Sequence, residues 1–305
     1  MSNQPLMLYL LLLIHQIINI SGDNTLCDMH DNTSCEASES AHNIHIQEEF
    51  SRQSKPFYEA AKKYKTDNLL PLIRAANIES NDIILDLACG PGLITTEVAK
   101  KNPKKVYGMD ITQDMLNIAT DHAKENNVLD QIEFIQGNVE ELPFDDNSLD
   151  TVITRWTFHH FDKLKTVLNE IYRVLKPQTG KLVFLEFCAP NNTEHEGIFN
   201  AFHTIRDPSH VWAYSEEGWI DALKNSAFRD ETINVVDRFS TKMNWKEFIK
   251  WTNPDENDKR ARESMYIIGK YMEKCECNVG MNFFENNDQE LMFISNYIVV
   301  IATKT

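Results

Sequence analysis

Aspartates and glycines follow short apolar segments of this sequence, and their types and spacing indicate a ligand-binding site. Asp86 ends the first of these segments, and Gly90 and Gly92 come directly after it. Asp110 ends the next segment, and Asn138 follows a third. Glycines allow the backbone to approach a ligand closely, because a Cβ would obstruct the approach. Carboxylates and amides beside them supply directional hydrogen bonds to hydroxyl, ammonium and amine groups.

These polar groups match the parts of a ligand that joins adenosine to an amino acid. A carboxylate at position 110 can accept charge-assisted hydrogen bonds from both hydroxyls of a ribose. Asn138 can present its amide to an adenine edge, with Ile111 and Val139 as apolar walls. Asp86 would face the ammonium group of the amino acid, directly or through water.

A nicotinamide dinucleotide is the main alternative ligand for such a turn. Its fingerprint requires a third glycine at the position that Thr95 holds here. It also places a pyrophosphate at the helix N-terminus, where the carboxylate of Asp86 would repel it. The sequence therefore favours the adenosyl ligand, and an NAD-linked oxidoreductase is the less favoured alternative.

The polar groups lie on a chain in which strand-like and helix-like segments alternate. Short, continuous apolar runs are typical of parallel strands that are buried on both faces. Their alternation with helices predicts an α/β fold with a doubly wound, mostly parallel sheet. The expected strands are 82–88, 104–111, 131–137, 148–156, 180–187, 231–238 and 296–304. The expected helices are 56–76, 93–101, 112–127 with Thr112 as N-cap, 162–175, 215–228 and most of 244–277.

Four motifs resemble those of class I S-adenosylmethionine-dependent methyltransferases. They read ILDLACGPG, VYGMDIT, GNVEELPFDDNSLDTVITRWTFHHF and EIYRVLKPQTGKLVFLEF. The resemblance is closest to the small-molecule branch that includes ubiquinone and menaquinone methyltransferases. It implies a Rossmann-like methyltransferase fold whose seven-stranded sheet, with helical additions, ends in an antiparallel strand.

The resemblance also implies S-adenosylmethionine as cofactor and places its site on ten residues. These are Asp86, Ala88, Gly90, Gly92, Asp110, Ile111, Met115, Asn138, Val139 and Arg155. Two departures from the family pattern stand out. Asn138 replaces a frequent aspartate, and the turn after Pro177 reads QTG where the family usually has two glycines.

His159 and His160 are the candidate catalytic residues, because they follow the fourth strand, where a substrate would meet the methyl group. A hydroxyl or acidic-carbon acceptor would use one of them as general base. A carboxylate or thiolate acceptor needs no base, and Arg155 and Arg206 could then orient it. The segment 201–212, which contains Arg206, either lines the substrate cavity or faces solvent.

The composition limits the classes of molecule that this protein is expected to bind. The net charge of −16 disfavours binding to nucleic acid, because phosphate backbones would be repelled. The histidines and cysteines show no spacing typical of a metal site. The expected partner is a small-molecule substrate. A methyltransferase-like protein that binds a ligand without turnover is the second hypothesis.

The first fifty residues differ from the rest, since Arg52 is the first basic residue. We expect 1–22 to be a signal peptide or a membrane anchor, because Leu6–Ile14 is continuously apolar. We expect 23–50 to be an acidic, disordered linker and 51–305 to be the methyltransferase domain. This organisation predicts a secretory or membrane-anchored protein, with association at the N-terminus, and a cytoplasmic protein is the alternative.

Overall fold

The computed structural model describes residues 40–63, 65–244, 281–285 and 291–305. The part from Ala41 onward forms one compact unit. Its helices are α2 (Ala41–Lys63), α3 (Lys65–Ala76), α4 (Leu93–Ala99), α5 (Gln113–Glu125), α6 (Leu164–Val174), α7 (Thr193–Arg206) and α8 (Glu216–Lys224). Its strands are β1 (Ile83–Leu87), β2 (Lys105–Asp110), β3 (Ile132–Gln136), β4 (Thr151–Arg155), β5 (Lys181–Phe187), β6 (Ile233–Asn244), β7 (Met281–Glu285) and β8 (Leu291–Thr303). Short 3-10 helices lie at Leu129–Gln131, Phe158–His160 and Asp230–Thr232.

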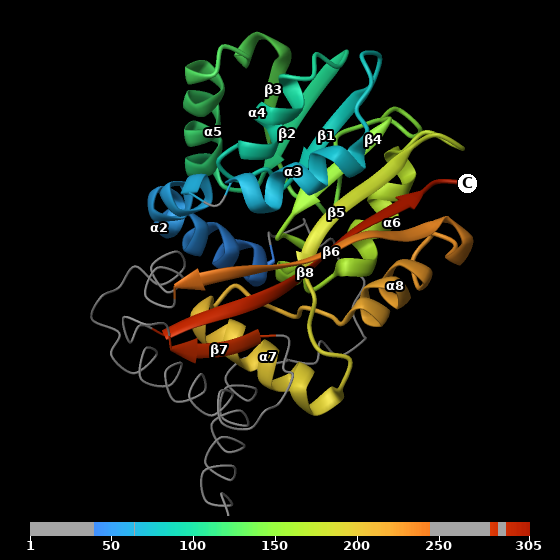
Figure 1. Cartoon of the computed structure of the whole chain (residues 1–305). Coiled ribbons are helices and arrows are strands. Elements are labelled where there is room, and N and C mark those ends of the chain that lie inside the picture. Colours follow the sequence, from blue (N-terminus) through green and yellow to red (C-terminus); the bar gives the residue numbers. More distant parts are fainter. Residues whose placement is uncertain (1–39, 64, 245–280, 286–290) are drawn as a thin grey trace, which may run out of the picture. The chain divides into compact units, whose positions relative to one another are not determined.

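The strands form one mixed sheet in the order β3-β2-β1-β4-β5-β8-β6, and β7 pairs with β8 beside this path. Strands β1 to β5 are parallel to their neighbours. The last strand, β8, runs antiparallel to both β5 and β6. The seven strands along this path confirm the doubly wound sheet and its antiparallel final strand (Figure 1).

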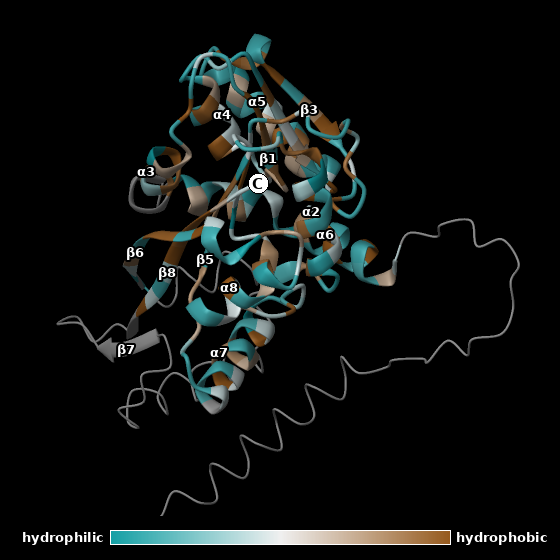
Figure 2. Cartoon of the chain, turned by 90° about the vertical axis from the view of Figure 1, so that its right-hand side faces the viewer, coloured by the Kyte–Doolittle hydropathy of each residue, from teal (hydrophilic) through white to brown (hydrophobic). Residues whose placement is uncertain are grey.

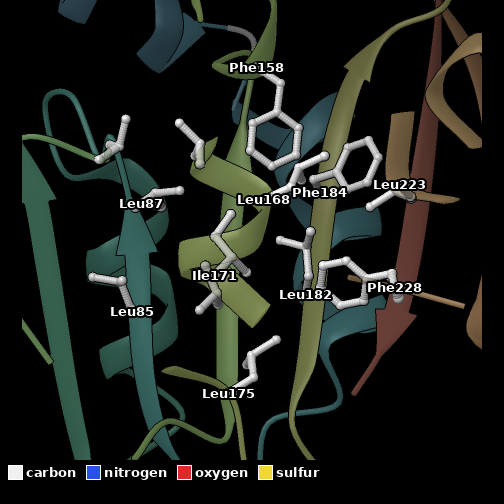
Figure 3. Close-up of a cluster of buried hydrophobic side chains, with 14 of the residues drawn as sticks. Leu85, Leu87, Phe158, Leu168, Ile171, Leu175, Leu182, Phe184, Leu223 and Phe228 are labelled. Atoms are coloured by element: carbon white, nitrogen blue, oxygen red, sulfur yellow. The ribbon is translucent and has the colours of Figure 1, made fainter. Parts of the chain in front are cut away.

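The sheet is buried because alternate residues of its strands face different helical layers. Leu85 and Leu87 of β1 and Leu182 of β5 belong to a core cluster with Leu168 and Ile171 of α6 (Figure 3). Burying a leucine or isoleucine side chain completely contributes about 1.5–3 kcal/mol. Figure 2 shows hydrophobic residues gathered on the strands and hydrophilic residues along the outer faces of the helices. This packing fixes the strand ends that carry the polar groups.

The N-terminal boundary of the folded part differs from the expectation. Helix α2 begins at Ala41, so residues 41–50 are helical and the boundary expected at 51 falls inside a helix. Pro56, which favours the first turn of a helix, lies within α2 instead. The stripe formed by Ile46, Phe50 and Phe57 supplies the apolar contacts that an acidic linker would lack.

Other expectations have mixed outcomes. Strands β6 and β8 are longer than predicted, and helix α7 was not predicted. Three expected segments lie outside the described residues: 1–22, expected as signal peptide or anchor, 23–39 of the expected linker, and most of the helix expected over 244–277. None of the described helices is both long and apolar enough to cross a bilayer.

Candidate functional site

A cavity that is partly open to solvent lies at the carboxyl ends of the strands in the first half of the sheet. Nine of the ten expected cofactor residues line it. They are Asp86, Ala88, Gly90, Asp110, Ile111, Met115, Asn138, Val139 and Arg155. The tenth, Gly92, lies at the N-cap of α4 and supports the cavity from outside.

The turn after β1 adopts a conformation that demands its glycines. Gly90 and Gly92 have φ values of 52° and 73°, in the left-handed region. A Cβ on Gly92 would also lie 2.7 Å from the Cβ of Ala119, so the glycine lets α5 pack closely. Ala88 has a φ of 50° without being glycine, which costs about 1–2 kcal/mol. Backbone strain of this kind is often found at ligand-binding sites.

Asp110 joins the turn after β1 to the end of β2. Its two carboxylate oxygens accept the N–H groups of Gly90 and Thr112, each at 2.8 Å. Each oxygen keeps a second lone pair, and the side chain lines the cavity. Thr112 is the residue before α5, as expected, although its hydroxyl makes no capping bond. The aspartate is thus held in place by backbone donors and can still accept two ligand hydroxyls.

Asp86 and Arg155 place a carboxylate and a guanidinium on neighbouring strands at one end of the cavity. Asp86 is 1% exposed and accepts a 2.5 Å hydrogen bond from the hydroxyl of Thr95. Burial raises the pKa of Asp86 to about 7, and the hydrogen bond from Thr95 opposes the shift. Arg155 is half-buried, and its loss of hydration lowers its pKa to about 10, while Asp86 attracts it. Its Nη1 has no hydrogen-bond partner among the described residues.

Asn138 is oriented by its own turn. Its Oδ1 accepts the N–H of Glu140 at 3.0 Å, so the Nδ2 amide is the group left to a ligand in the cavity. Ile111, Met115 and Val139 line the same cavity as apolar walls. An amide donor beside apolar walls can bind the polar edge of a flat heteroaromatic ring.

The structure separates the two candidate catalytic histidines. His160 lines the cavity, and its ring lies edge-on to Phe50 at 5.1 Å. His159 does not line the cavity. Its Nδ1 lies 2.8 Å from Oε2 of Glu186, and the side chain is 2% exposed. His159 is therefore not a candidate for contact with substrate, because the short 3-10 helix directs it to Glu186.

Glu186 organises the loop after β4 from behind the cavity. Its Oε1 accepts the N–H groups of Thr157 at 2.6 Å and Phe158 at 2.7 Å. Burial raises the pKa of Glu186 to about 7, against these backbone hydrogen bonds. The histidine and arginine side chains of 201–212 pack around His159 on this inner side and do not line the cavity.

Helix α2 covers the cavity and supplies site residues that the sequence reasoning missed. Nε2 of His42 lies 2.8 Å from the carbonyl oxygen of His160. Asn43 donates to Glu140 at 3.3 Å, and the hydroxyl of Tyr58 lies 2.9 Å from Nδ1 of His122 on α5. Figure 1 shows α2 lying against α5. The signal was the apolar spacing of Ile46, Phe50 and Phe57, which lies on one helix face.

Comparison with known proteins agrees with this geometry. Residues 85–184 match a family described as "Methyltransferase domain". The chain is 30% identical over 171 residues to the uncharacterized methyltransferase YcgJ of Bacillus subtilis, covering 54% of this chain and 66% of that protein. It is 38% identical over 137 residues to the ubiquinone/menaquinone biosynthesis C-methyltransferase UbiE of Rickettsia prowazekii. That match covers 43% of this chain and 52% of UbiE, so the chain spans about half the length of this relative.

The crystal structure of YcgJ has the same fold. It superposes with a TM-score of 0.68 at 22% identity, over 78% of this chain and 98% of that chain. At this level of identity the likeness concerns the fold alone.

Proposed function

The chain carries a class I methyltransferase domain, and we propose that it binds S-adenosylmethionine and transfers the methyl group to a small-molecule acceptor. The observation that supports this most is the cavity in which Asp86, Asp110 and Arg155 lie together. Each offers the charge that one part of this cofactor needs. The cofactor supplies a methyl group activated by positive sulfur.

Arg155 and Asp86 would hold the amino-acid end. The guanidinium of Arg155 has a buried nitrogen without an acceptor among the described residues, and a carboxylate would satisfy it. The carboxylate of Asp86 would receive the ammonium group. A phosphate in place of the amino acid would meet Asp86 unfavourably, which argues against NAD.

Asp110 and Asn138 would hold the adenosine end. The carboxylate accepts two backbone N–H groups and keeps lone pairs for the two ribose hydroxyls. Asn138 would donate from Nδ2 to a ring nitrogen of adenine, since its Oδ1 is engaged by Glu140. This explains how an asparagine can serve where related enzymes carry an aspartate.

The remaining part of the cavity would receive the acceptor. Aromatic side chains of Phe50, Phe57, Trp156 and Phe161 line it, together with His160. Such walls exclude water and hold a small molecule in line with the transferred group.

Calorimetric titration of the full chain tests the cofactor. We expect micromolar binding of S-adenosylmethionine, no binding of NAD, and a loss of at least about tenfold in affinity for Asp110→Ala, since a charge-assisted hydrogen bond contributes about 1.5–3 kcal/mol. Asp121→Ala, an exposed aspartate on α5, is the matched control and should bind normally. Binding of NAD, or of neither ligand, would overturn the proposal.

A transfer assay tests the reaction. Radiolabelled methyl groups should move from S-adenosylmethionine to at least one member of a panel that contains a phenol, a thiol, a carboxylic acid and an aromatic amine. Tight binding without transfer to any of them would favour the alternative, a methyltransferase-like binding protein.

A further inference from the structure

Two oxygen atoms of Ser209 lie near Nδ1 of His160, and they determine which ring nitrogen carries the proton. Nδ1 lies 3.1 Å from the carbonyl oxygen of Ser209 and 3.1 Å from its Oγ. A carbonyl oxygen only accepts hydrogen bonds, so Nδ1 must donate to it. In a neutral imidazole the other nitrogen, Nε2, then carries a lone pair.

The hydroxyl of Ser209 is directed away from His160 by Asp207. Ser209 Oγ donates to Oδ1 of Asp207 at 2.6 Å, because an ionised carboxylate accepts but does not donate. The N–H of Ser209 donates to the same oxygen at 3.1 Å. The hydroxyl proton is thereby engaged, and its oxygen offers Nδ1–H of His160 a second acceptor. Ser209 and Asp207 are 1% and 2% exposed and do not line the cavity.

The surroundings keep His160 neutral and Asp207 charged. Burial lowers the pKa of His160, although Asp207, the Ser209 carbonyl and Glu186 raise it and Arg206 lowers it. The pKa of Asp207 is lowered: burial raises it, and the charge that His160 carries when protonated, the charge of Arg206 and the hydrogen bond from Ser209 more than offset this. A neutral imidazole with a lone pair on Nε2 is the form that accepts a proton.

The positively charged side chains that line the described cavity have other partners, so they do not favour an anionic acceptor. Arg155 is the partner proposed for the carboxylate of the cofactor. Lys163 donates to Glu140 at 2.8 Å, and this ion pair satisfies its charge. Arg206, considered from sequence as an anchor for anions, does not line the cavity and lies 4.0 Å from Asp207. Of the two histidines that line the described cavity, His42 has its Nε2 2.8 Å from the carbonyl oxygen of His160, so we take His160 as the one that faces the acceptor's reacting group.

We propose that Ser209 and Asp207 are positioning residues that hold His160 as the Nδ1–H tautomer, so that its Nε2 takes a proton from an uncharged acceptor. This inference rests on the proposed methyl transfer. The acceptor, an alcohol, phenol or acidic carbon, gives its proton to Nε2. Its freed electron pair forms the bond to the methyl carbon, and the sulfur keeps the pair of the broken C–S bond. The imidazolium left behind faces the carboxylate of Asp207 and later returns its proton to water.

Nitrogen NMR on the full chain, labelled in its histidines, tests the tautomer directly. The His160 signals are assigned by their absence in His160→Gln. We expect Nδ1 protonated and Nε2 unprotonated at pH 8. Asp207→Asn keeps an oxygen that accepts from Ser209 but removes its negative charge, so the hydrogen bond that holds the Ser209 hydroxyl proton is weaker and the hydroxyl can turn and donate to Nδ1. We expect this variant to shift His160 toward the Nε2–H form.

Matched variants separate positioning from folding. Asp221→Asn, an exposed aspartate on α8, should leave the His160 signals unchanged. Ser209→Ala keeps the carbonyl acceptor and should retain the Nδ1–H form with a smaller preference. Protonated Nε2 in the wild type, or an unchanged tautomer in Asp207→Asn, would overturn the proposal.

Kinetic measurements on the same samples distinguish a positioning role from a structural one, because a positioning residue affects kcat without affecting cofactor binding. With an acceptor that the wild type methylates, Asp207→Asn should lower kcat by about 10²–10⁴-fold and leave the Kd of S-adenosylmethionine unchanged. A parallel loss of kcat and cofactor affinity would show a structural role and refute positioning. Failure of the wild type to bind the cofactor would refute the proposed function instead, whatever the tautomer.

Discussion

If Asp86 receives the ammonium group as proposed, the binding of S-adenosylmethionine should depend on pH in a range that is easy to measure. Its pKa is raised to about 7 because the side chain is buried. The ammonium of the cofactor requires the ionised form, so binding at lower pH must first remove a proton from Asp86. Lowering the pH should therefore weaken binding, and protons should be released as the complex forms.

The size of the effect follows from the pKa. With a value of about 7, roughly nine-tenths of the apo protein carries a protonated Asp86 at about pH 6 and roughly one-tenth at about pH 8. The Kd should then be about tenfold higher at about pH 6 than at about pH 8, a difference of about 1.4 kcal/mol.

Thr95 allows the cause to be tested with a nearly isosteric change. Its hydroxyl donates to Asp86 and opposes the rise in pKa. Thr95→Val removes this bond, which contributes about 1.5–3 kcal/mol, so the pKa of Asp86 should rise by about one to two units. Binding at pH 7 should weaken by about fivefold to fiftyfold. Thr96→Val is the matched control, because the Thr96 hydroxyl on the same helix is buried without a hydrogen-bond partner among the described residues.

Calorimetric titrations in two buffers of different ionisation enthalpy give both the Kd and the number of protons released. The amino group of the cofactor also titrates near pH 8, and Asp86→Asn measures that contribution separately. A Kd that is equal at pH 6 and pH 8, with no proton released, would refute the reasoning. The reasoning would also be refuted if Thr96→Val changed the Kd at pH 7 as much as Thr95→Val.

Three further changes have definite expected outcomes. Gly92→Ala should lower the free energy of unfolding by at least about 2 kcal/mol in a denaturant titration, because an alanine is strained at this positive φ and its Cβ would clash with Ala119. Gly197→Ala, in the middle of α7 where a Cβ meets open space, should instead raise it by about 0.5–1 kcal/mol. Arg155→Met should weaken S-adenosylmethionine by about 10-fold or more but leave the affinity for methylthioadenosine, which lacks the amino-acid carboxylate, nearly unchanged in the same titration. Glu186→Gln should lower the free energy of unfolding by about 1.5–3 kcal/mol, because the amide cannot accept from every donor around it.

The cofactor side of the cavity could be predicted from sequence because its residues are fixed by strand ends. A buried parallel strand is a continuous apolar run, and its last residue lies at the carboxyl edge of the sheet. Asp86, Asp110 and Asn138 were located in this way, and all three line the cavity. The turn after Pro177 has QTG where two glycines are usual, and here Gln178 itself takes the left-handed conformation, at a φ of 65°.

The acceptor side could not be predicted in the same way, because segments distant in sequence build it. Composition assigned His42 to an acidic linker, yet it lies on α2 and lines the cavity. Adjacent histidines cannot be distinguished by spacing, and only the position of Glu186 decides that His159 faces inward. Ser209 meets His160 through a contact between residues 49 apart in the chain.

The loop after β4 connects the buried hydrogen bonds of Glu186 to the wall of the cavity. Trp156 lines the cavity with a φ of 56°, a conformation that costs a bulky residue about 1–2 kcal/mol. The next two N–H groups, of Thr157 and Phe158, both donate to Glu186, and charge-assisted bonds of this kind contribute about 1.5–3 kcal/mol each. Glu186 thus offsets the strain and fixes the turn that presents Trp156 and His160 to the cavity. A carboxylate that does not line the cavity thereby helps to fix the shape of the cavity wall.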